Sequence, residues 1–279
     1  MAGNGNIDFF CLECYTDKSE VNTLQTEVIK IDRENMDLDA LKRAGEILKS
    51  GGLVAFPTET VYGLGGDGLH EESSRKIYEA KGRPSDNPLI VHVADMEHLE
   101  KIVKKVPKAA YKLAEAFWPG PMTMILEKND LVPYGTTGGL DTVAIRMPSD
   151  PIALELIRQG GGYIAAPSAN TSGRPSPTTA QHVYEDLQGK IPMILDGGAV
   201  TIGLESTIVD LTEEIPTILR PGFISLDMVQ AVLGEAQIDR GLIANDSNIH
   251  PKAPGMKYRH YAPKADLKIV EGPMEQVIS

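Results

Sequence analysis

The stretch LVAFPTETVYGLG, residues 53–65, carries the first indication of the fold. Its first four residues are apolar, and a short apolar run that ends abruptly at a proline is typical of a buried strand. Residues 37–49 before it and residues 71–80 after it are amphipathic at helical spacing, and glycines follow both, at Gly51 and Gly82. A buried strand between two helices is the repeating unit of an α/β fold.

The same alternation continues from residue 25 to residue 235. It predicts an α/β domain with a mixed, twisted sheet and flanking helices. Consecutive strands without an intervening helix, between residues 191 and 219, imply that part of the sheet is antiparallel. Besides the segments above, we expect strands at residues 26–32, 89–93, 122–126, 142–147, 164–166, 191–195, 207–211 and 217–219, and helices at residues 96–106, 108–117, 151–158, 178–187 and 226–233.

Composition and charge bound the class of protein. The chain has 279 residues and a formal net charge of −12. Broad nucleic-acid surfaces need Lys and Arg to neutralise phosphates, so the acidic balance argues against one while still allowing a local basic pocket. Because no run of about 18 apolar residues occurs, we expect no membrane span. Cys11 and Cys14 lack further zinc ligands nearby, and we interpret them as incidental thiols of a reducing cytoplasm.

Beyond the α/β domain the character of the chain changes. Residues 1–24 are predicted to be an N-terminal leader, and residues 236–264 to be a linker with weak periodicity. One more strand is expected at residues 267–270. A lone strand cannot bury itself, so this strand either joins the main sheet or begins a second domain.

Familiar nucleotide-binding motifs are missing. No G-x-x-x-x-G-K-[ST] occurs, and the glycine-rich residues 63–68 lack the order G-x-G-x-x-G. Polar residues instead follow the predicted strands, at positions where open α/β sheets present ligand-binding groups. Thr58 and Glu59 come directly after the strand at residues 53–56, and they form either a turn with a Thr cap or a ligand contact.

Basic residues occupy several comparable positions. Lys81 and Arg83, two residues apart in a loop, suit a phosphate, although the alternative is a solvated helix end. Arg220 follows another strand. Residues 252–264 carry four basic residues and no acidic one, so they form either a lid over an anionic ligand or a plain linker. Together with Arg146, these cations predict a polyphosphate pocket in an acidic protein.

Two polar residues are embedded in apolar strands. His92 is either a satisfied core residue or a ligand for a carboxylate. Arg146 needs an anionic partner if its guanidinium is buried, and Glu59, Asp141 and a ligand are the alternatives.

Small residues surround a further pair of hydrogen-bonding side chains. Ser168 and Asn170 both follow the strand at residues 164–166, where small neighbours permit close approach to the backbone. Ser176, a little further on, is either a ligand contact or the cap of the helix at residues 178–187.

These segments belong to a longer series of motifs. They are PTETVYGLG at 57–65, EAKGRPSDNPLIVHV at 79–93, WPGPMT at 118–123, GLDTVAIRMP at 139–148, IAAPSAN at 164–170, GRPSPT at 173–178, DGG at 196–198, ESTIVD at 205–210 and LRPG at 219–222. In this order they resemble the YrdC/Sua family of threonylcarbamoyl-AMP synthases. The match covers about residues 25–235, and PGMKYRHYAP in the linker is similar to the longer, two-domain branch of that family.

The resemblance implies a domain organisation. Residues 25–235 are expected to form a YrdC-like catalytic domain and residues 236–264 a linker that acts as a lid. Residues 265–279 are expected to begin a Rossmann-like C-terminal domain that this chain truncates, which puts the lid and any inter-domain regulation in question.

The resemblance also implies an activity. L-threonine, bicarbonate and ATP are expected to give threonylcarbamoyl-AMP and pyrophosphate, with Mg²⁺ bound to the ATP through ligands that the sequence does not assign. The product is expected to pass to the tRNA threonylcarbamoyl-transferase machinery in the cytoplasm. No membrane association and no stable nucleic-acid binding are expected.

Residue roles follow from the same resemblance. Lys81 and Arg83 are the expected catalytic residues because they hold the ATP phosphates. Threonine is expected to contact Thr58, His92, Arg146 and Ser168. Further ATP contacts are expected from Asn87, Thr142, Ser168, Asn170, Ser176, Arg220 and the linker residue Tyr258.

Two other functions remain as alternatives. One is a non-catalytic module of the same fold that binds double-stranded RNA or tRNA, and the other is a carbamoyl-handling domain related to hydrogenase maturation factors. Thr58, His92 and Arg146 beside the cations favour the synthase, because an RNA-binding module does not need an amino-acid pocket. The net charge of −12 also disfavours the RNA-binding alternative.

Overall fold

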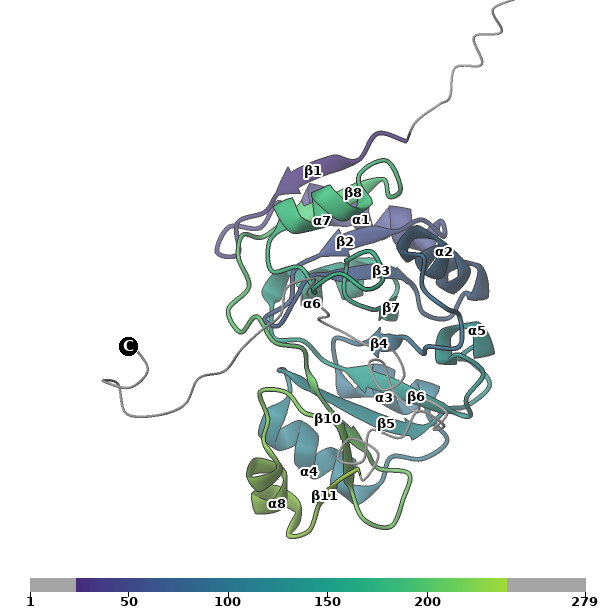
Figure 1. Cartoon of the computed structure of the whole chain (residues 1–279), viewed down its shortest axis with the longest axis vertical. Coiled ribbons are helices and arrows are strands. Elements are labelled where there is room, and N and C mark those ends of the chain that lie inside the picture. Colours follow the sequence, from purple (N-terminus) through teal and green to yellow (C-terminus); the bar gives the residue numbers. More distant parts are fainter. Residues whose placement is uncertain (1–23, 240–279) are drawn as a thin grey trace, which may run out of the picture.

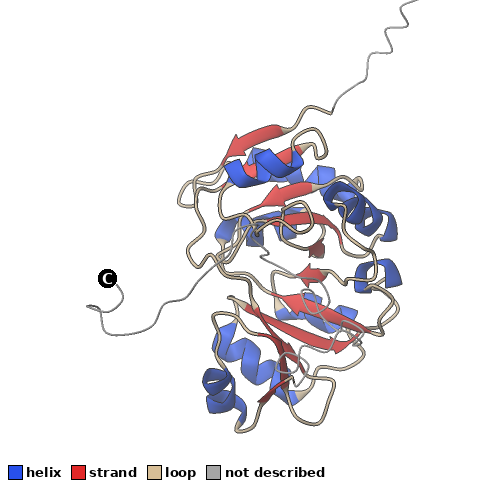
Figure 2. Ribbon diagram, viewed as in Figure 1, coloured by secondary structure: helices blue, strands red, loops and turns tan. Residues whose placement is uncertain are grey.

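The computed structural model describes residues 24–239, which form one twisted sheet with helices on its faces (Figures 1 and 2). Its strand order is β1-β8-β2-β3-β7-β4-β6-β5-β9-β10-β11. Parallel and antiparallel neighbours both occur, which confirms the predicted mixed sheet. The strands are β1 (Glu27–Lys30), β2 (Val54–Phe56), β3 (Gly63–Asp67), β4 (Ile90–His92), β5 (Met122–Glu127), β6 (Thr142–Arg146), β7 (Ile164–Ala166), β8 (Met193–Asp196), β9 (Thr207–Asp210), β10 (Thr217–Arg220) and β11 (Gln237–Ile238).

Most helices begin and end close to the positions that the sequence predicts. Asp37 caps the first helix, where its side chain accepts a hydrogen bond from the Ala40 N–H at 3.0 Å. None of the helices between residues 24 and 239 is long and apolar enough to cross a bilayer. The helices are α1 (Leu38–Lys49), α2 (Glu71–Lys81), α3 (Met96–Ile102), α4 (Lys108–Phe117), α5 (Tyr134–Thr137), α6 (Pro151–Gln159), α7 (Ala180–Leu187) and α8 (Leu226–Leu233).

Helices cover both faces of the part of the sheet that holds β1, β8 and β2. α1 and α6 pack together on one face, with Leu41 and Leu156 between them. α2 and α7 lie on the opposite face, where Ile77 and Val183 join a second cluster (Figure 1). This burial on both faces explains why β2 and β8 read as apolar runs, whereas the edge strand β1 is largely exposed.

The part of the sheet that holds β4, β6, β5 and β9 has two different faces. Val91 and Ile145 point to one face and pack against α3 and α4 in a large apolar cluster. Ile90 and Ala144 alternate with them and point to the other face, where the apolar cluster is small. The candidate site lies on this second face.

Three features differ from the sequence predictions. β3 reads GLGGD and was not predicted as a strand, yet it pairs with β2 and β7. Its glycines permit that packing, since a Cβ added to Gly65 would lie 2.7 Å from Ile164 Cγ2. The helix predicted at residues 96–106 ends at Ile102 because Val103 is extended and forms a β-bridge with Lys128. The short elements α5 and β11 were not predicted.

Candidate active site

A cavity opens on the second face of the sheet, beside Ile90. β4 runs parallel to β6 and antiparallel to β7. The C-terminal ends of β4 and β6 therefore point in one direction and the C-terminal end of β7 points in the opposite direction. As a result, the polar side chains that follow these strands are spread across the face of the sheet and are not gathered at one set of strand ends. The polar residues that line the cavity are Thr58, Thr60, Arg83, His92, Arg146, Ser168, Glu205, Ser206 and Arg220.

Arg146 has an anionic partner inside the protein. Its Nη2 donates to Glu59 Oε1 at 2.6 Å, and its Nη1 donates to Thr60 Oγ1 at 2.9 Å. Of the two internal partners considered from the sequence, Glu59 is therefore the correct one. Asp141 instead accepts a hydrogen bond from the Tyr134 hydroxyl at 2.8 Å.

Thr58 also makes the local contacts that a turn requires. Its Oγ1 accepts hydrogen bonds from the backbone N–H groups of Thr60 and Val61 at 3.1 and 3.3 Å, and lies 2.7 Å from the Val61 carbonyl. The turn interpretation is thus confirmed. It is compatible with a ligand contact, because the same residue lines the cavity.

His92 is buried at the end of β4 and lines the same cavity. Its Nδ1 lies 3.1 Å from the Ile90 carbonyl oxygen. Burial, together with the neighbouring Arg146 guanidinium, lowers the pKa of His92 to about 3. The imidazole is therefore neutral at physiological pH.

Lys81 is the last residue of α2, and its side chain is buried, so it is not a solvated helix end. Its Nζ donates to the backbone oxygens of Ser168 and Asn170. Burial holds the pKa of Lys81 well below its ordinary value, and the neighbouring charge of Arg83 lowers it further. The structure thus joins the two predicted pairs, Lys81 with Arg83 and Ser168 with Asn170, at one place.

Arg83 and Asn87 are buried together in the loop after α2. The Arg83 Nη2 donates to the Pro88 carbonyl at 3.2 Å, and its Nε donates to the Asn87 carbonyl at 3.4 Å. Asn87 Oδ1 is buried without a hydrogen-bond partner in the described part of the chain. Asn87 does not line the cavity, so its contact with ATP stays a prediction.

Glu205 links two of the predicted ATP contacts. Its carboxylate accepts from the Ser176 hydroxyl at 2.8 Å and pairs with Arg220 Nη1 at 2.8 Å. The Arg220 guanidinium also donates to the Ser206 carbonyl at 3.0 Å. Ser176 does not cap α7, because Thr179 does so by accepting from the His182 N–H.

Comparisons with known proteins agree with this geometry. The Sua5/YciO/YrdC family, described as "Telomere recombination", matches residues 46–222, and the family described as "Threonylcarbamoyl-AMP synthase, C-terminal domain" matches residues 224–279. The chain belongs to the Sua5/YciO/YrdC family. This confirms the family that the sequence motifs indicate.

Relatives within this family are similar over most of the chain. Threonylcarbamoyl-AMP synthase of Pyrococcus abyssi is 53% identical, and the match covers 88% of this chain and 72% of that protein. The Bacillus subtilis protein of the same name is 52% identical, with 85% and 68% covered. The crystal structure of P. abyssi Sua5 complexed with L-threonine superposes with a TM-score of 0.86 at 52% identity, covering 90% of this chain and 74% of that one.

Not every residue expected from the Sua5/YciO/YrdC resemblance reaches the cavity. Thr142 begins β6, four residues before Arg146 and on the same face of the sheet, so it lies about 13 Å away along the strand. It is not among the residues that line the cavity, and neither are Lys81, Asn87, Asn170 and Ser176. Lys81 and Asn170 contact the lining residue Ser168, and Ser176 contacts the lining residue Glu205. Tyr258 lies outside the described residues, as do Cys11 and Cys14.

Three polar residues that line the cavity were not predicted to belong to the site. They are Thr60, Glu205 and Ser206, which lie within the motifs PTETVYGLG and ESTIVD. Glu205 and Ser206 directly precede β9, so they repeat the pattern of polar residues at the boundary of a buried strand. Applied to both ends of every strand, that pattern would have found them.

A magnesium ion fits this site only together with phosphates. Between residues 24 and 239, no three His, Cys, Asp or Glu side chains are grouped to hold a metal. Glu205 is the acidic side chain among the described lining residues. Mg²⁺ commonly binds through one or two carboxylates plus substrate phosphates, so the donor set matches a nucleotide-borne ion.

Proposed function

We propose that this chain is an L-threonylcarbamoyladenylate synthase, which makes threonylcarbamoyl-AMP and pyrophosphate from L-threonine, bicarbonate and ATP. The observation that carries this proposal is one cavity with two kinds of lining. Arg146, His92 and Thr58 suit an amino acid, while Arg83 and Arg220 suit phosphates. The names of the relatives and the L-threonine in P. abyssi Sua5 support the same activity.

The amino-acid end of the site is built around Arg146. Its guanidinium suits the threonine carboxylate, because planar N–H groups match two carboxylate oxygens. Thr58 and the neutral His92 offer uncharged hydrogen-bonding groups to the rest of the amino acid. Ser168 lines the cavity and its backbone oxygen contacts Lys81, which supports a role for Ser168 with both substrates.

The phosphate end is built around Lys81 and Arg83. We infer that they hold the ATP phosphates, with Asn170, Ser176 and Arg220 as further nucleotide contacts. Mg²⁺ bound to those phosphates would neutralise part of their charge. Glu205 is the side chain best placed to take part in holding such an ion.

The proposed reaction needs little covalent chemistry from the protein. The threonine amine attacks bicarbonate, water leaves, and N-carboxy-threonine forms. An oxygen of the new carboxylate attacks the α-phosphorus of ATP, and the bond to the pyrophosphate leaving group breaks. The chain contributes by placing both reactants and by stabilising the negative charge that develops on the phosphates.

The wider role follows from the product. Threonylcarbamoyl-AMP is a reactive mixed anhydride, and we propose that a tRNA threonylcarbamoyl-transferase machinery consumes it in the cytoplasm. The competing hypothesis of an RNA-binding module receives no support from the cavity, because Lys81, Arg83 and Arg146 are buried and not displayed on a surface.

Calorimetric titration with L-threonine tests the amino-acid site. We expect saturable binding by the wild-type protein, weaker binding of L-serine, and no detectable threonine binding by Arg146→Gln. Arg158→Gln is the matched control because that arginine is exposed and pairs with Glu155 on its own helix. Failure of the wild-type protein to bind threonine would contradict the proposed function.

A further inference from the structure

Arg146 is held on three sides by the protein. Besides the contacts of Nη2 with Glu59 and of Nη1 with Thr60, its Nε donates to the Gly120 carbonyl at 3.4 Å. A guanidinium has five N–H groups. These three contacts use one N–H each, so one N–H on Nη1 and one on Nη2 have no partner among the described residues. Because Arg146 lines the cavity, that pair suits one carboxylate.

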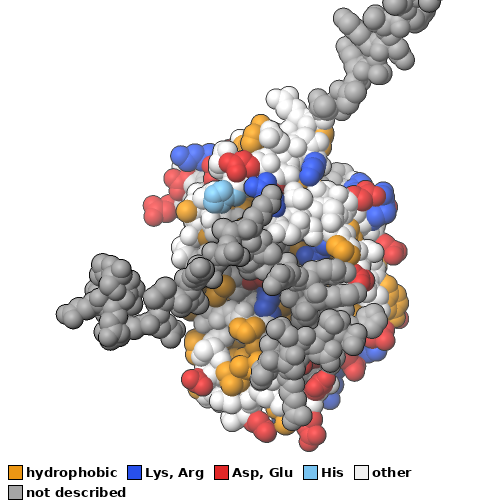
Figure 3. Space-filling model, in the orientation of Figure 1, with side chains coloured by type: hydrophobic (Ala, Val, Ile, Leu, Met, Phe, Trp, Pro, Cys, Tyr) orange, Lys and Arg blue, Asp and Glu red, His pale blue; other side chains and the backbone are white. Residues whose placement is uncertain are grey.

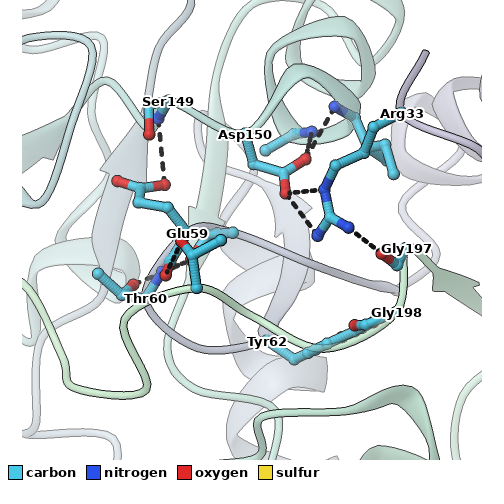
Figure 4. A network of polar contacts seen from close by, with 12 residues as sticks. Arg33, Glu59, Thr60, Tyr62, Ser149, Asp150, Gly197 and Gly198 are labelled. Carbon is cyan, nitrogen blue, oxygen red and sulfur yellow. Dashed lines mark hydrogen bonds and ion pairs between the residues drawn. The ribbon is translucent and has the colours of Figure 1, made fainter.

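Glu59 is itself fixed in place. Its Oε1 accepts from Arg146, and its Oε2 accepts from the Ser149 backbone N–H at 3.1 Å. Figure 4 shows the contact of Glu59 with Ser149. The next residue, Asp150, caps α6 and forms an ion pair with Arg33 at 2.9 Å. Because both of its oxygens accept hydrogen bonds from the protein, the Glu59 carboxylate does not reorient when a ligand binds. The protein alone therefore sets the orientation of Arg146.

Charge is distributed unequally along the cavity. The buried Arg146 is compensated by Glu59, whose side chain is 8% exposed against 5% for Arg146. Lys81 lies behind the lining residue Ser168, and its Nζ contacts backbone and amide oxygens. It forms no ion pair with a carboxylate of the described residues, and Glu205 and Asp186 act on it only as nearby charges. A polyanion therefore gains most near Lys81, whereas Arg146 offers directed N–H groups with little surplus charge.

We propose that Glu59 reserves Arg146 for the carboxylate of the amino-acid substrate. It orients the guanidinium, and its negative charge excludes phosphate groups from this end of the cavity. Glu59 is thus a positioning and selectivity residue that acts through Arg146. This inference rests on the proposed function, because it takes the carboxylate that Arg146 binds to be that of threonine.

The Glu59→Gln variant tests this role by calorimetric titration with L-threonine, with and without saturating inorganic pyrophosphate. In the wild-type protein, we expect pyrophosphate to change the threonine dissociation constant less than about twofold. The variant should bind threonine about tenfold more weakly, because the glutamine amide cannot accept from Arg146 and Ser149 at once. Pyrophosphate should weaken its threonine binding further, by competing for Arg146.

Two further variants sharpen the result. Glu59→Asp keeps the charge on a shorter side chain, so threonine binding should weaken while pyrophosphate still does not compete. Glu97→Gln, at an exposed pair with Lys101, should match the wild-type protein. If Glu59→Gln does not fold, the aspartate variant decides, since competition by pyrophosphate there would overturn the role of the charge.

The outcomes separate this inference from the proposed function. A Glu59→Gln protein with wild-type threonine affinity, or one whose threonine binding ignores pyrophosphate, would overturn the role of Glu59. A wild-type protein that binds no threonine would instead overturn the proposed function.

Discussion

Lys81 is buried without a carboxylate partner among the described residues. Burying an ammonium group costs several kcal/mol unless another group offsets the loss of hydration. Arg146 and Arg220 line the cavity and each forms an ion pair with a glutamate, whereas Lys81 beside it forms none with the described residues and feels Glu205 and Asp186 only as nearby charges. An anion that reaches Lys81 raises its pKa toward the ordinary value, so phosphate binding and protonation of Lys81 reinforce each other.

Replacing Lys81 should separate catalysis from stability. We expect Lys81→Met to slow pyrophosphate release at least about a hundredfold, because a charge that stabilises the phosphates is lost. Its melting temperature should stay close to that of the wild-type protein, because removal of a buried charge offsets the loss of the hydrogen bonds to the Ser168 and Asn170 carbonyls. Arg83→Ala should also lose activity while remaining folded. Lys101→Met, at an exposed position, is the control, and full activity of Lys81→Met would remove Lys81 from the phosphate site.

The neutral His92 should make stability depend on pH. Its pKa is lowered from 6.5 to about 3 in the folded protein, so below pH 6.5 the unfolded chain binds a proton that the folded chain does not. The associated stability is present above pH 6.5 and is lost as the pH falls. At pH 5 the loss should be about 2 kcal/mol relative to pH 7. Urea unfolding at both pH values should show a smaller loss for His92→Gln, and equal losses would contradict the account.

Local patterns predict the helices and strands of this fold well. α4 and β7 have the predicted bounds because Pro107 and Pro167 mark a helix start and a strand end. β3 escaped prediction because a glycine-rich run carries no strand periodicity, and only the packing of β2 and β7 around it makes it a strand. Element type thus follows from local spacing except where neighbours in space decide it.

The composition of the site was predictable, but its arrangement was not. The contact between Glu59 and Arg146 joins residues 87 positions apart. Because a buried guanidinium needs an anion, the sequence predicts that the partner of Arg146 is negatively charged. Strand spacing excludes Asp141, because it lies five residues before Arg146 at the far end of β6. That Glu59 reaches Arg146 depends on the order β2-β3-β7-β4-β6 in the sheet, which no local pattern specifies.

The contact between α1 and α6 offers a test at the scale of the elements. A Cβ added to Gly45 would lie 2.6 Å from the backbone of Gln159, where nothing flexible is able to yield. We expect Gly45→Ala to lower the free energy of unfolding by about 1–3 kcal/mol through overpacking. Glu46→Ala, on the exposed face of the same helix, should change it by less than about 0.5 kcal/mol. Urea unfolding of both variants checks this, and an unchanged Gly45→Ala protein would contradict the packing.

On the scale of the whole molecule, acidic residues outnumber basic ones, whereas the cavity is lined mainly by arginines among its charged residues. Acidic and basic side chains are interspersed among the described residues that are visible on the face in Figure 3. The net charge of −12 is thus a property of the average surface, and it fits a small pocket for one nucleotide better than a broad tRNA surface. The absence of stable nucleic-acid binding remains a prediction.

Pyrophosphate release from ATP in bicarbonate buffer tests the central claim most directly, because it reports whether the two ends of the cavity act on their substrates together. The account predicts release that depends on L-threonine and that is lost in Arg146→Gln, while the exposed-site variant Arg158→Gln keeps it. Release at the same rate without threonine would contradict the account.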